Sequence, residues 1–126
     1  MKLFTNRSSL GHEDSIVSVD VLESNNEIIA TCSDDSTIRL WDLRMDESIK
    51  VYKDPLFVEN TPSNVKILPD GSRILAGAGS NILAFDMKTD KILVEASTLH
   101  KNCTRDEINF VAISPDGKYT ASCDDS

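Results

Sequence analysis

Two short motifs occur twice in this chain at nearly the same spacing, and this internal repeat limits what the chain can fold into. Leu68-Pro69-Asp70-Gly71 returns as Ser114-Pro115-Asp116-Gly117, which puts the two prolines 46 residues apart (115 minus 69). Ile38-Arg39-Leu40-Trp41-Asp42 returns as Ile82-Leu83-Ala84-Phe85-Asp86, with the aromatic residues 44 apart (85 minus 41). A period in this range indicates a repeated supersecondary unit that buries its apolar faces against its neighbours.

The residues between these motifs have the pattern of short strands. In residues 16–21 the three valines alternate with other residues, which is the period of a strand with one apolar face. Each Pro-Asp-Gly provides a preset φ, a local side-chain hydrogen bond and a residue that tolerates positive φ, so each closes a hairpin. No eleven-residue window has helical periodicity, and we expect an all-β chain. The expected strands cover residues 16–21, 28–32, 37–41, 49–52, 64–68, 73–76, 81–85, 91–95, 108–113 and 118–122.

Four strands per repeat of roughly 40–45 residues are typical of a β-propeller blade. The predicted fold class is therefore an all-β, incomplete propeller of about two and a half four-stranded blades. We place the first blade at about 11–53, the second at about 54–96 and the beginning of a third at about 97–126. Because blades bury their faces only against other blades, we expect a piece of a longer protein, and no stable monomer from these residues alone.

The first repeat carries a distinctive set of polar residues. Gly11-His12 precedes the first expected strand, and residues 31–42 read Thr-Cys-Ser-Asp-Asp-Ser-Thr-Ile-Arg-Leu-Trp-Asp. This pattern resembles a nearly complete WD40 repeat. The resemblance implies a hydrogen-bonded tetrad in which Asp35 accepts from His12. His12 then contacts the Thr31 hydroxyl, which in turn meets the indole N–H of Trp41. Linked in this way, four polar groups that packing buries are satisfied, where each left unpaired costs about 1–3 kcal/mol.

The second repeat departs from this pattern. Phe85 stands where the first repeat has Trp41, and no histidine precedes it at a comparable distance. Residues 76–80 indicate a turn that is shorter by two residues than the corresponding turn of the first repeat. We expect this blade to keep its shape through apolar packing and to lack the tetrad.

The third repeat is less regular still. His100 lies eight residues before Ile108, whereas the histidine of the first repeat lies four residues before its strand. A tetrad built from His100 and an aspartate at 124 or 125 stays an open alternative. Together with the second repeat, Glu107-Ile108-Asn109 and residues 121–126 resemble the family of WD repeat-containing protein 53.

A second resemblance concerns partners. Residues 28–44 end in Trp41-Asp42-Leu43-Arg44 and resemble the docking box of WD40 substrate receptors of cullin-RING ubiquitin ligases. The resemblance implies that Asp42 and Arg44 contact the ligase adaptor, the guanidinium through bidentate bonds to a carboxylate. Because this box overlaps the general WD40 pattern, Arg44 is the only residue in it that favours a ligase receptor over other WD40 proteins. Two functions stay open: a protein-interaction scaffold that acts as a ligase substrate receptor, and a structural subunit of a multiprotein assembly without a ligase link.

We do not expect an enzyme. His12, Thr31 and Asp35 contain the groups of a hydroxyl–imidazole–carboxylate triad, but nucleophilic catalysis needs an exposed hydroxyl beside an oxyanion hole. Residue 31 instead falls in the middle of an apolar strand. The sequence predicts no catalytic residue, no cofactor and no small-molecule substrate.

The three cysteines indicate no metal site. Cys103 and Cys123 with His100 match no zinc-ligand spacing and lack a fourth ligand. Cys32 and Cys123 occupy similar strand positions, and we expect both thiols to be buried. Cys103 falls in a polar stretch and is expected to be exposed.

Charge and hydropathy narrow the class of partner. The net charge is −8, the acidic residues are spread along the chain, and no basic cluster exceeds two residues, so nucleic-acid binding is not expected. The acidic surface suits a basic protein partner and equally suits solubility. No run of eighteen apolar residues is available to span a membrane, and residues 1–8 lack the apolar core of a secretory signal. We therefore expect a location in the cytoplasm or nucleus.

Overall fold

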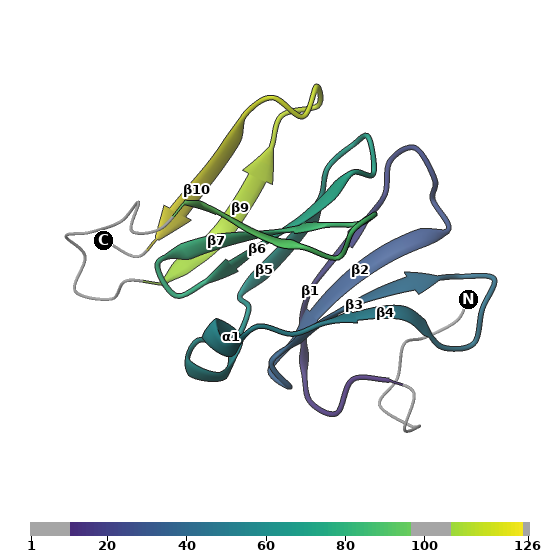
Figure 1. The fold of residues 1–126 in the computed structure, drawn as a ribbon, viewed down its shortest axis with the longest axis horizontal. Coiled ribbons are helices and arrows are strands. Elements are labelled where there is room, and N and C mark those ends of the chain that lie inside the picture. The colour runs from purple at the N-terminus through teal and green to yellow at the C-terminus, as the bar shows by residue number, and fades with distance from the viewer. Residues whose placement is uncertain (1–10, 97–106, 125–126) are drawn as a thin grey trace.

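The computed structural model describes residues 11–96 and 107–124, which form three antiparallel sheets. The sheets lie side by side in chain order (Figure 1). The first has the strand order β1-β2-β3-β4, the second β5-β6-β7-β8, and the third pairs β9 with β10. The strands are β1 (Ile16–Val21), β2 (Ile28–Ser33), β3 (Thr37–Asp42), β4 (Ser48–Tyr52), β5 (Asn64–Ile67), β6 (Arg73–Ala78), β7 (Asn81–Asp86), β8 (Ile92–Ala96), β9 (Ile108–Ile113) and β10 (Thr120–Asp124).

The prediction of an all-β, incomplete propeller is confirmed by this arrangement of blade-like sheets. Every expected strand is present, and no strand end differs from the expected one by more than two residues. The order within each sheet follows the chain because neighbouring strands are joined by short turns, which favour antiparallel pairing.

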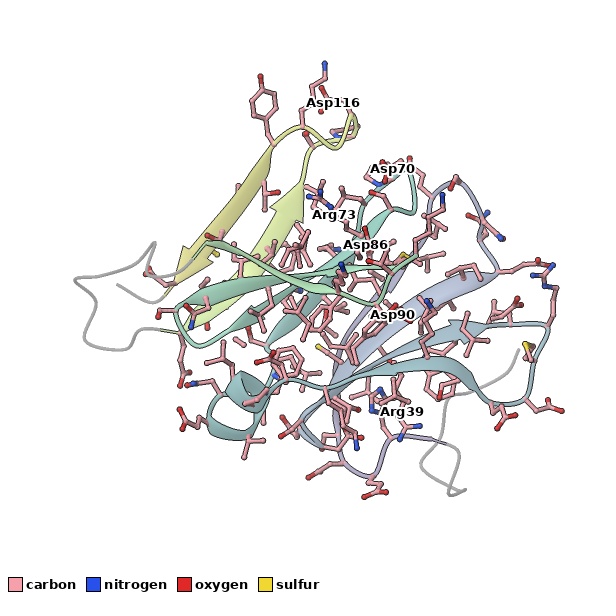
Figure 2. The ribbon with its side chains drawn as sticks, in the orientation of Figure 1. Arg39, Asp70, Arg73, Asp86, Asp90 and Asp116 are labelled. Carbon is pink, nitrogen blue, oxygen red and sulfur yellow. The ribbon has the colours of Figure 1, made fainter. Side chains whose placement is uncertain are left out.

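Two hairpins close on the Pro-Asp-Gly motifs. Gly71 and Gly117 have φ values of +71° and +69°, a conformation in which a side chain would be strained. Each glycine N–H donates to the carbonyl three residues earlier at 2.8 Å. Asp70 and Asp116 lie at the tips of these turns, and each carboxylate accepts the N–H two residues later (Figure 2). The same turn chemistry therefore ends both hairpins, as the repeated motif predicted.

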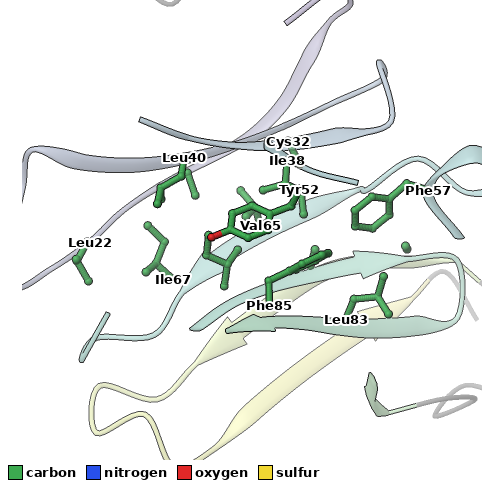
Figure 3. Packing of buried hydrophobic residues seen from close by; sticks show 14 residues of the cluster. Leu22, Cys32, Ile38, Leu40, Tyr52, Phe57, Val65, Ile67, Leu83 and Phe85 are labelled. Atoms are coloured by element: carbon green, nitrogen blue, oxygen red, sulfur yellow. The ribbon is translucent and has the colours of Figure 1, made fainter. Parts of the chain in front are cut away.

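The apolar side chains are buried in two seams, one between each pair of neighbouring sheets. In the first seam, between the first and second sheets, the rings of Tyr52 and Phe57 lie 5.1 and 5.8 Å from the ring of Phe85 (Figure 3). The first seam contains Leu22, Ala30, Cys32, Ile38, Leu40, Tyr52, Phe57, Val65, Ile67, Ile74, Ala76, Ala78, Leu83 and Phe85. The second seam, between the second and third sheets, contains Leu75, Ile82, Ala84, Ile108 and Val111.

Polar side chains join the first strands of the three sheets, which belong to different backbone ladders. Asp20 in β1 accepts the N–H of Ile67 at 2.8 Å, and Asn64 in β5 accepts the N–H of Val111 at 3.1 Å. The Asn64 amide also donates to the Ser18 hydroxyl at 3.1 Å. Because the N–H groups of these inner strands have no strand partner on this side, the side-chain acceptors satisfy them and fix the spacing of the sheets.

The alternating valines of β1 are exposed rather than buried. Val17, Val19 and Val21 are 47%, 56% and 45% exposed, while Ser18 and Asp20 point toward the second sheet. Within residues 11–96 and 107–124 no sheet packs on the valine face of the first sheet. The period of the strand was therefore predicted correctly, but it did not show which face is covered.

A short helix, α1 (Pro55–Glu59), was not expected from the sequence. Asp54 caps it by accepting the N–H of Leu56 at 2.8 Å, Pro55 occupies its first turn, and Phe57 inserts into the first seam. Five residues are too few for a helical period to be visible, so only the Asp-Pro pair marks this helix. No helix in the described parts of the chain is long and apolar enough to cross a membrane.

We expect Phe85→Ala to lower the free energy of unfolding by about 3–5 kcal/mol, because it empties the centre of the first seam. Phe110→Ala removes a ring that is 49% exposed and is expected to cost less than about 1 kcal/mol. Urea denaturation of the full chain measures both. Equal losses for the two variants would contradict this description of the core.

Candidate functional site

Four polar side chains from separate elements of the first sheet meet in one chain of hydrogen bonds. His12 precedes β1, Thr31 lies in β2, Asp35 lies in the β2–β3 turn and Trp41 lies in β3. His12 Nδ1 lies 2.8 Å from Asp35 Oδ2, and its Nε2 lies 2.6 Å from Thr31 Oγ1. The Trp41 Nε1–H donates to Thr31 Oγ1 at 2.8 Å. The structure thus brings together the four residues that the sequence pattern grouped.

A neutral imidazole with its proton on Nδ1 satisfies every polar atom in this network. Nδ1–H donates to Asp35, Nε2 accepts from the Thr31 hydroxyl, and that oxygen accepts from the indole, so the partners of the two ring nitrogens assign the tautomer. His12, Thr31 and Trp41 are all buried. Any one of these atoms left unpaired would cost about 1–3 kcal/mol.

The network includes residues that the sequence reasoning missed. The Thr37 hydroxyl donates to Asp35 Oδ1 at 2.6 Å, and the Thr37 and Glu13 N–H groups donate to the same carboxylate at 3.0 Å each. The Ser33 hydroxyl donates to the carbonyl of Asp14 at 3.2 Å and accepts the Asp35 N–H at 3.1 Å. The sequence signal for these bonds was the pair of hydroxyl residues, Ser33 and Thr37, on either side of the turn that contains Asp35, because such residues form local hydrogen bonds.

The ionisation states of the two central groups follow from this geometry. Burial lowers the pKa of His12 below its usual value, although the neighbouring Asp35 acts in the opposite direction. Burial alone would raise the pKa of Asp35, but hydrogen bonds from Thr37, His12 and the Glu13 N–H outweigh it, so this pKa is lowered. A neutral imidazole therefore faces an ionised carboxylate at neutral pH.

The Thr31 hydroxyl is not placed to attack a substrate. Thr31 is 1% exposed, its hydroxyl proton is directed at His12 Nε2, and its hydroxyl oxygen accepts from Trp41. A nucleophile needs access to the substrate and a base that is free to take its proton. The arrangement instead ties the loop before β1 to β2 and β3. Within the described ranges, no group of three or more His, Cys, Asp or Glu side chains could hold a metal ion.

The second sheet has an aromatic ring where the first has its indole. Phe85 is opposite Ile74, as Trp41 is opposite Ile29, and it is buried in the first seam. The β6–β7 turn has two residues between its closing pair, and the β2–β3 turn has three. The turn is therefore shorter by one residue, and the expected shortening by two residues was wrong. Gly79 begins this turn at φ +55°, where a Cβ would lie 2.9 Å from the Asn60 side chain.

Asp42 and Arg44 lie together at the end of β3. The Asp42 carboxylate accepts from Arg44 Nε at 2.8 Å, from Nη2 at 2.6 Å and from the Arg44 N–H at 3.0 Å. Glu27 Oε2 lies 3.2 Å from Arg44 Nε. These hydrogen bonds lower the pKa of Asp42 to about 2 and raise the pKa of Arg44. The Arg44 side chain is 62% exposed, as expected, but its guanidinium already forms a bidentate pair within its own chain.

The cysteines only partly follow the sequence-based expectation. Cys32 is buried in the first seam, and burial raises the pKa of its thiol to about 12. Cys123 is exposed, so the prediction of a buried thiol there was wrong. β10 is the last strand of its sheet in the described residues, and no further strand covers this side chain. Cys103, His100 and the alternative tetrad of the third repeat, which needs His100, fall outside the described residues.

Comparison with known proteins gives a consistent family assignment. The model of the WD domain, G-beta repeat, matches residues 4–42 and 95–126, which together are 71 of the 126 residues (39 plus 32). The stretch between these matches contains the second repeat, which lacks the histidine and the tryptophan of the first.

Several curated proteins are similar over much of the chain. The WD repeat-containing protein 53 homolog of Dictyostelium discoideum is 26% identical over 93% of this chain and 31% of its own length. Eukaryotic translation initiation factor 3 subunit I of Aspergillus oryzae is 33% identical over 86% of the chain and 33% of its own length. Mouse apoptotic protease-activating factor 1 is 35% identical over 60% of the chain and 7% of its own length. The chain thus spans about a third or less of these relatives.

Thr31→Val should lower the free energy of unfolding by about 2–4 kcal/mol, because it leaves both His12 Nε2 and the Trp41 N–H unpaired in a buried site. Thr120→Val changes an exposed threonine and should alter it by less than about 0.5 kcal/mol. Urea denaturation at neutral pH measures the difference. A loss for Thr31→Val no greater than that for Thr120→Val would show that the network does not hold the first sheet.

The free energy of unfolding should fall as the pH falls from 7.5 to 5.5. The pKa of His12 is lower in the folded chain than in the unfolded chain, so the unfolded chain takes up protons first, below about 6.5. Asp35 contributes its own loss only at more acidic pH, because its folded pKa is also lowered. His12→Gln should flatten the slope between pH 7.5 and 5.5, because it removes the group that takes up the proton. An unchanged slope in His12→Gln is the contrary result.

Proposed function

We propose, because the chain belongs to the WD40 family, that it is part of a protein-interaction scaffold in which Asp42 and Arg44 contact the adaptor of a cullin-RING ubiquitin ligase. WD40 repeats are binding modules, and the polar network of the first sheet is used internally to hold the blade together. We therefore expect partner proteins to bind at the exposed ends and edges of the sheets. The observation that carries the adaptor contact is an exposed guanidinium held in a fixed position by its neighbour.

The hydrogen bonds to Asp42 make the Arg44 guanidinium a better binding group for a partner protein than a free arginine side chain. A free side chain loses rotamer entropy when it binds, at about 0.5–1.5 kcal/mol, and two hydrogen bonds to Asp42 have already fixed this one. Nη1 has no partner among the described residues, so the outer edge of the guanidinium can still donate to a carboxylate or carbonyl of a partner. The internal pair also means that a partner adds to this corner without having to displace Asp42.

The alternative is a structural subunit of a multiprotein assembly with no ligase link. The similarity to a protein named as a subunit of eukaryotic translation initiation factor 3 favours this alternative. Both functions use the same fold and predict protein partners. They differ in whether the corner at Asp42 and Arg44 is needed for the principal contact.

Arg44→Ala is expected to abolish co-precipitation of the ligase adaptor by the tagged protein in cells, because it removes the only guanidinium of this corner. Arg44→Lys should fail as well, since an ammonium cannot form the two parallel hydrogen bonds. Asp42→Asn should weaken the interaction without abolishing it, because the guanidinium remains but is less firmly held. The melting temperature of all three should change little, since the Arg44 side chain is exposed and Asp42→Asn keeps the size of the side chain.

Lys118→Ala, in the exposed turn between β9 and β10, is the matched control and should bind the adaptor normally. Adaptor binding that survives Arg44→Ala would reject the receptor function. If, in addition, mass spectrometry of the precipitate finds a fixed multiprotein assembly without ligase subunits, the structural alternative holds.

A further inference from the structure

The inner and outer strands of the first two sheets are joined by different kinds of contact. At the inner strands, Ser18 and Asp20 of β1 accept backbone N–H groups of β5 at 3.3 and 2.8 Å. At the outer strands, Lys50 in β4 donates from Nζ to Asp90 Oδ1 and to the Met87 carbonyl, both at 2.6 Å. Asp90 lies where the β7–β8 hairpin approaches the first sheet (Figure 2). The Lys50 ammonium therefore connects this hairpin to β4.

Asp90 also contacts a buried ring of β4. Tyr52 is 5% exposed, and its hydroxyl has Asp90 as a side-chain hydrogen-bond partner. Burial first, and then the charge of Asp90 and this hydrogen bond, raise the pKa of Tyr52 to about 12, so the hydroxyl is a neutral donor. The Tyr52 ring lies 5.1 Å from the Phe85 ring in the first seam (Figure 3). Asp90 therefore binds two residues of β4 beside this pair of rings.

The apolar side chains of the two outer strands do not pack fully against each other. A cavity of about 350 Å³ lies between β4 and the hairpin, and the residues that line it include Lys50, Tyr52, Phe85, Asp90 and Ile92. Because protein interiors are close-packed, a space of this size means that the apolar groups on its two sides are not in full contact. Ile92 is accordingly 39% exposed. The contacts of Lys50 and Asp90 thus bridge a part of the seam that packing leaves open.

Both outer strands are also interrupted in the pairing within their own sheets. β4 and β8 are the last strands of their sheets, and each has a register shift, opposite Leu40–Trp41 in β3 and Ile82–Leu83 in β7. A bulge disrupts the ladder locally, and an edge strand has a ladder on one side alone. Asp90, in the turn before β8, has a φ of +57°, which is uncommon for a residue with a side chain. The turn therefore places this carboxylate beside β4 at a conformational cost.

We propose that Lys50 and Asp90 form a latch that closes the outer edge of the first seam, and that this edge opens when the latch is released. In the open form, β4 and the β7–β8 hairpin separate, and the rings of Tyr52 and Phe85 become an accessible apolar surface. The inner strands stay joined, because their contacts involve neither latch residue. Local opening is expected where buried apolar contacts are few and the polar contacts are partly exposed. The latch does not depend on the ligase contact proposed above.

Fluorine NMR of the full chain, labelled with 3-fluorotyrosine and titrated with a soluble nitroxide, measures this opening. Tyr119 is 73% exposed and is the internal reference, since the nitroxide should broaden its signal in every variant. Lys50→Met keeps the aliphatic stem and removes the ammonium, so the broadening of the Tyr52 signal should rise about fivefold. Asp90→Asn keeps a neutral acceptor and should raise this broadening about twofold.

Two controls separate opening of the outer edge from a general loss of structure. Lys66→Met removes the ammonium that pairs with Asp20 at the inner strands, at 3.2 Å, and should leave the Tyr52 broadening unchanged. Cys32 is fully buried in the same seam, so its rate of alkylation by iodoacetamide reports separation of the whole seam. That rate should be the same in Lys50→Met as in the unaltered chain.

Three results would overturn the proposal. The first is unchanged Tyr52 broadening in Lys50→Met, which would show that packing alone closes the edge. The second is an equal rise in Lys66→Met, which would show that the loss of any charge between the two sheets has this effect. The third is alkylation of Cys32 that accelerates together with the Tyr52 broadening, which would show that the sheets separate as a whole.

Discussion

A buried neutral imidazole between a carboxylate and a hydroxyl is the interaction on which the first sheet depends. The backbone ladder holds β1 to β4 together, but it does not fix the loop that carries His12. That loop is held because the imidazole bonds both the Asp35 carboxylate and the Thr31 hydroxyl, and the Glu13 N–H bonds the same carboxylate. A network that uses all its donors and acceptors internally builds a rigid blade and presents no reactive group to a substrate.

The second sheet keeps the shape of a blade through apolar packing instead of a polar network. It buries Phe85 against Tyr52 and Phe57 in the first seam, whereas the first sheet holds the matching residue, Trp41, in the polar network on its other face. Asp20 and Asn64 then connect the inner strands of successive sheets through backbone N–H groups. The exposed side chain of Arg44, held by Asp42 at the end of β3, takes no part in this packing.

The sequence predicted the strands well because their signals are local: period-2 alternation, Pro-Asp-Gly turns and a repeat that shows each element more than once. Features that depend on neighbours were missed. The valines of β1 have the right alternation, but only the arrangement of sheets shows that their face is exposed. Cys123 matches Cys32 in position and differs in burial for the same reason. Thr37 was overlooked because its role depends on where the Asp35 carboxylate points, and the exposed Arg44 was predicted without its internal partner.

The protonation state of His12 shows whether this hydrogen-bonded network forms in the folded chain. Long-range proton–nitrogen NMR of the folded chain at pH 7 distinguishes the two neutral tautomers from the imidazolium. We expect a proton on Nδ1, a bare Nε2 and a Trp41 indole N–H that exchanges slowly with solvent, because each of these atoms is buried and paired. A proton on Nε2, a charged ring or a rapidly exchanging indole would contradict it.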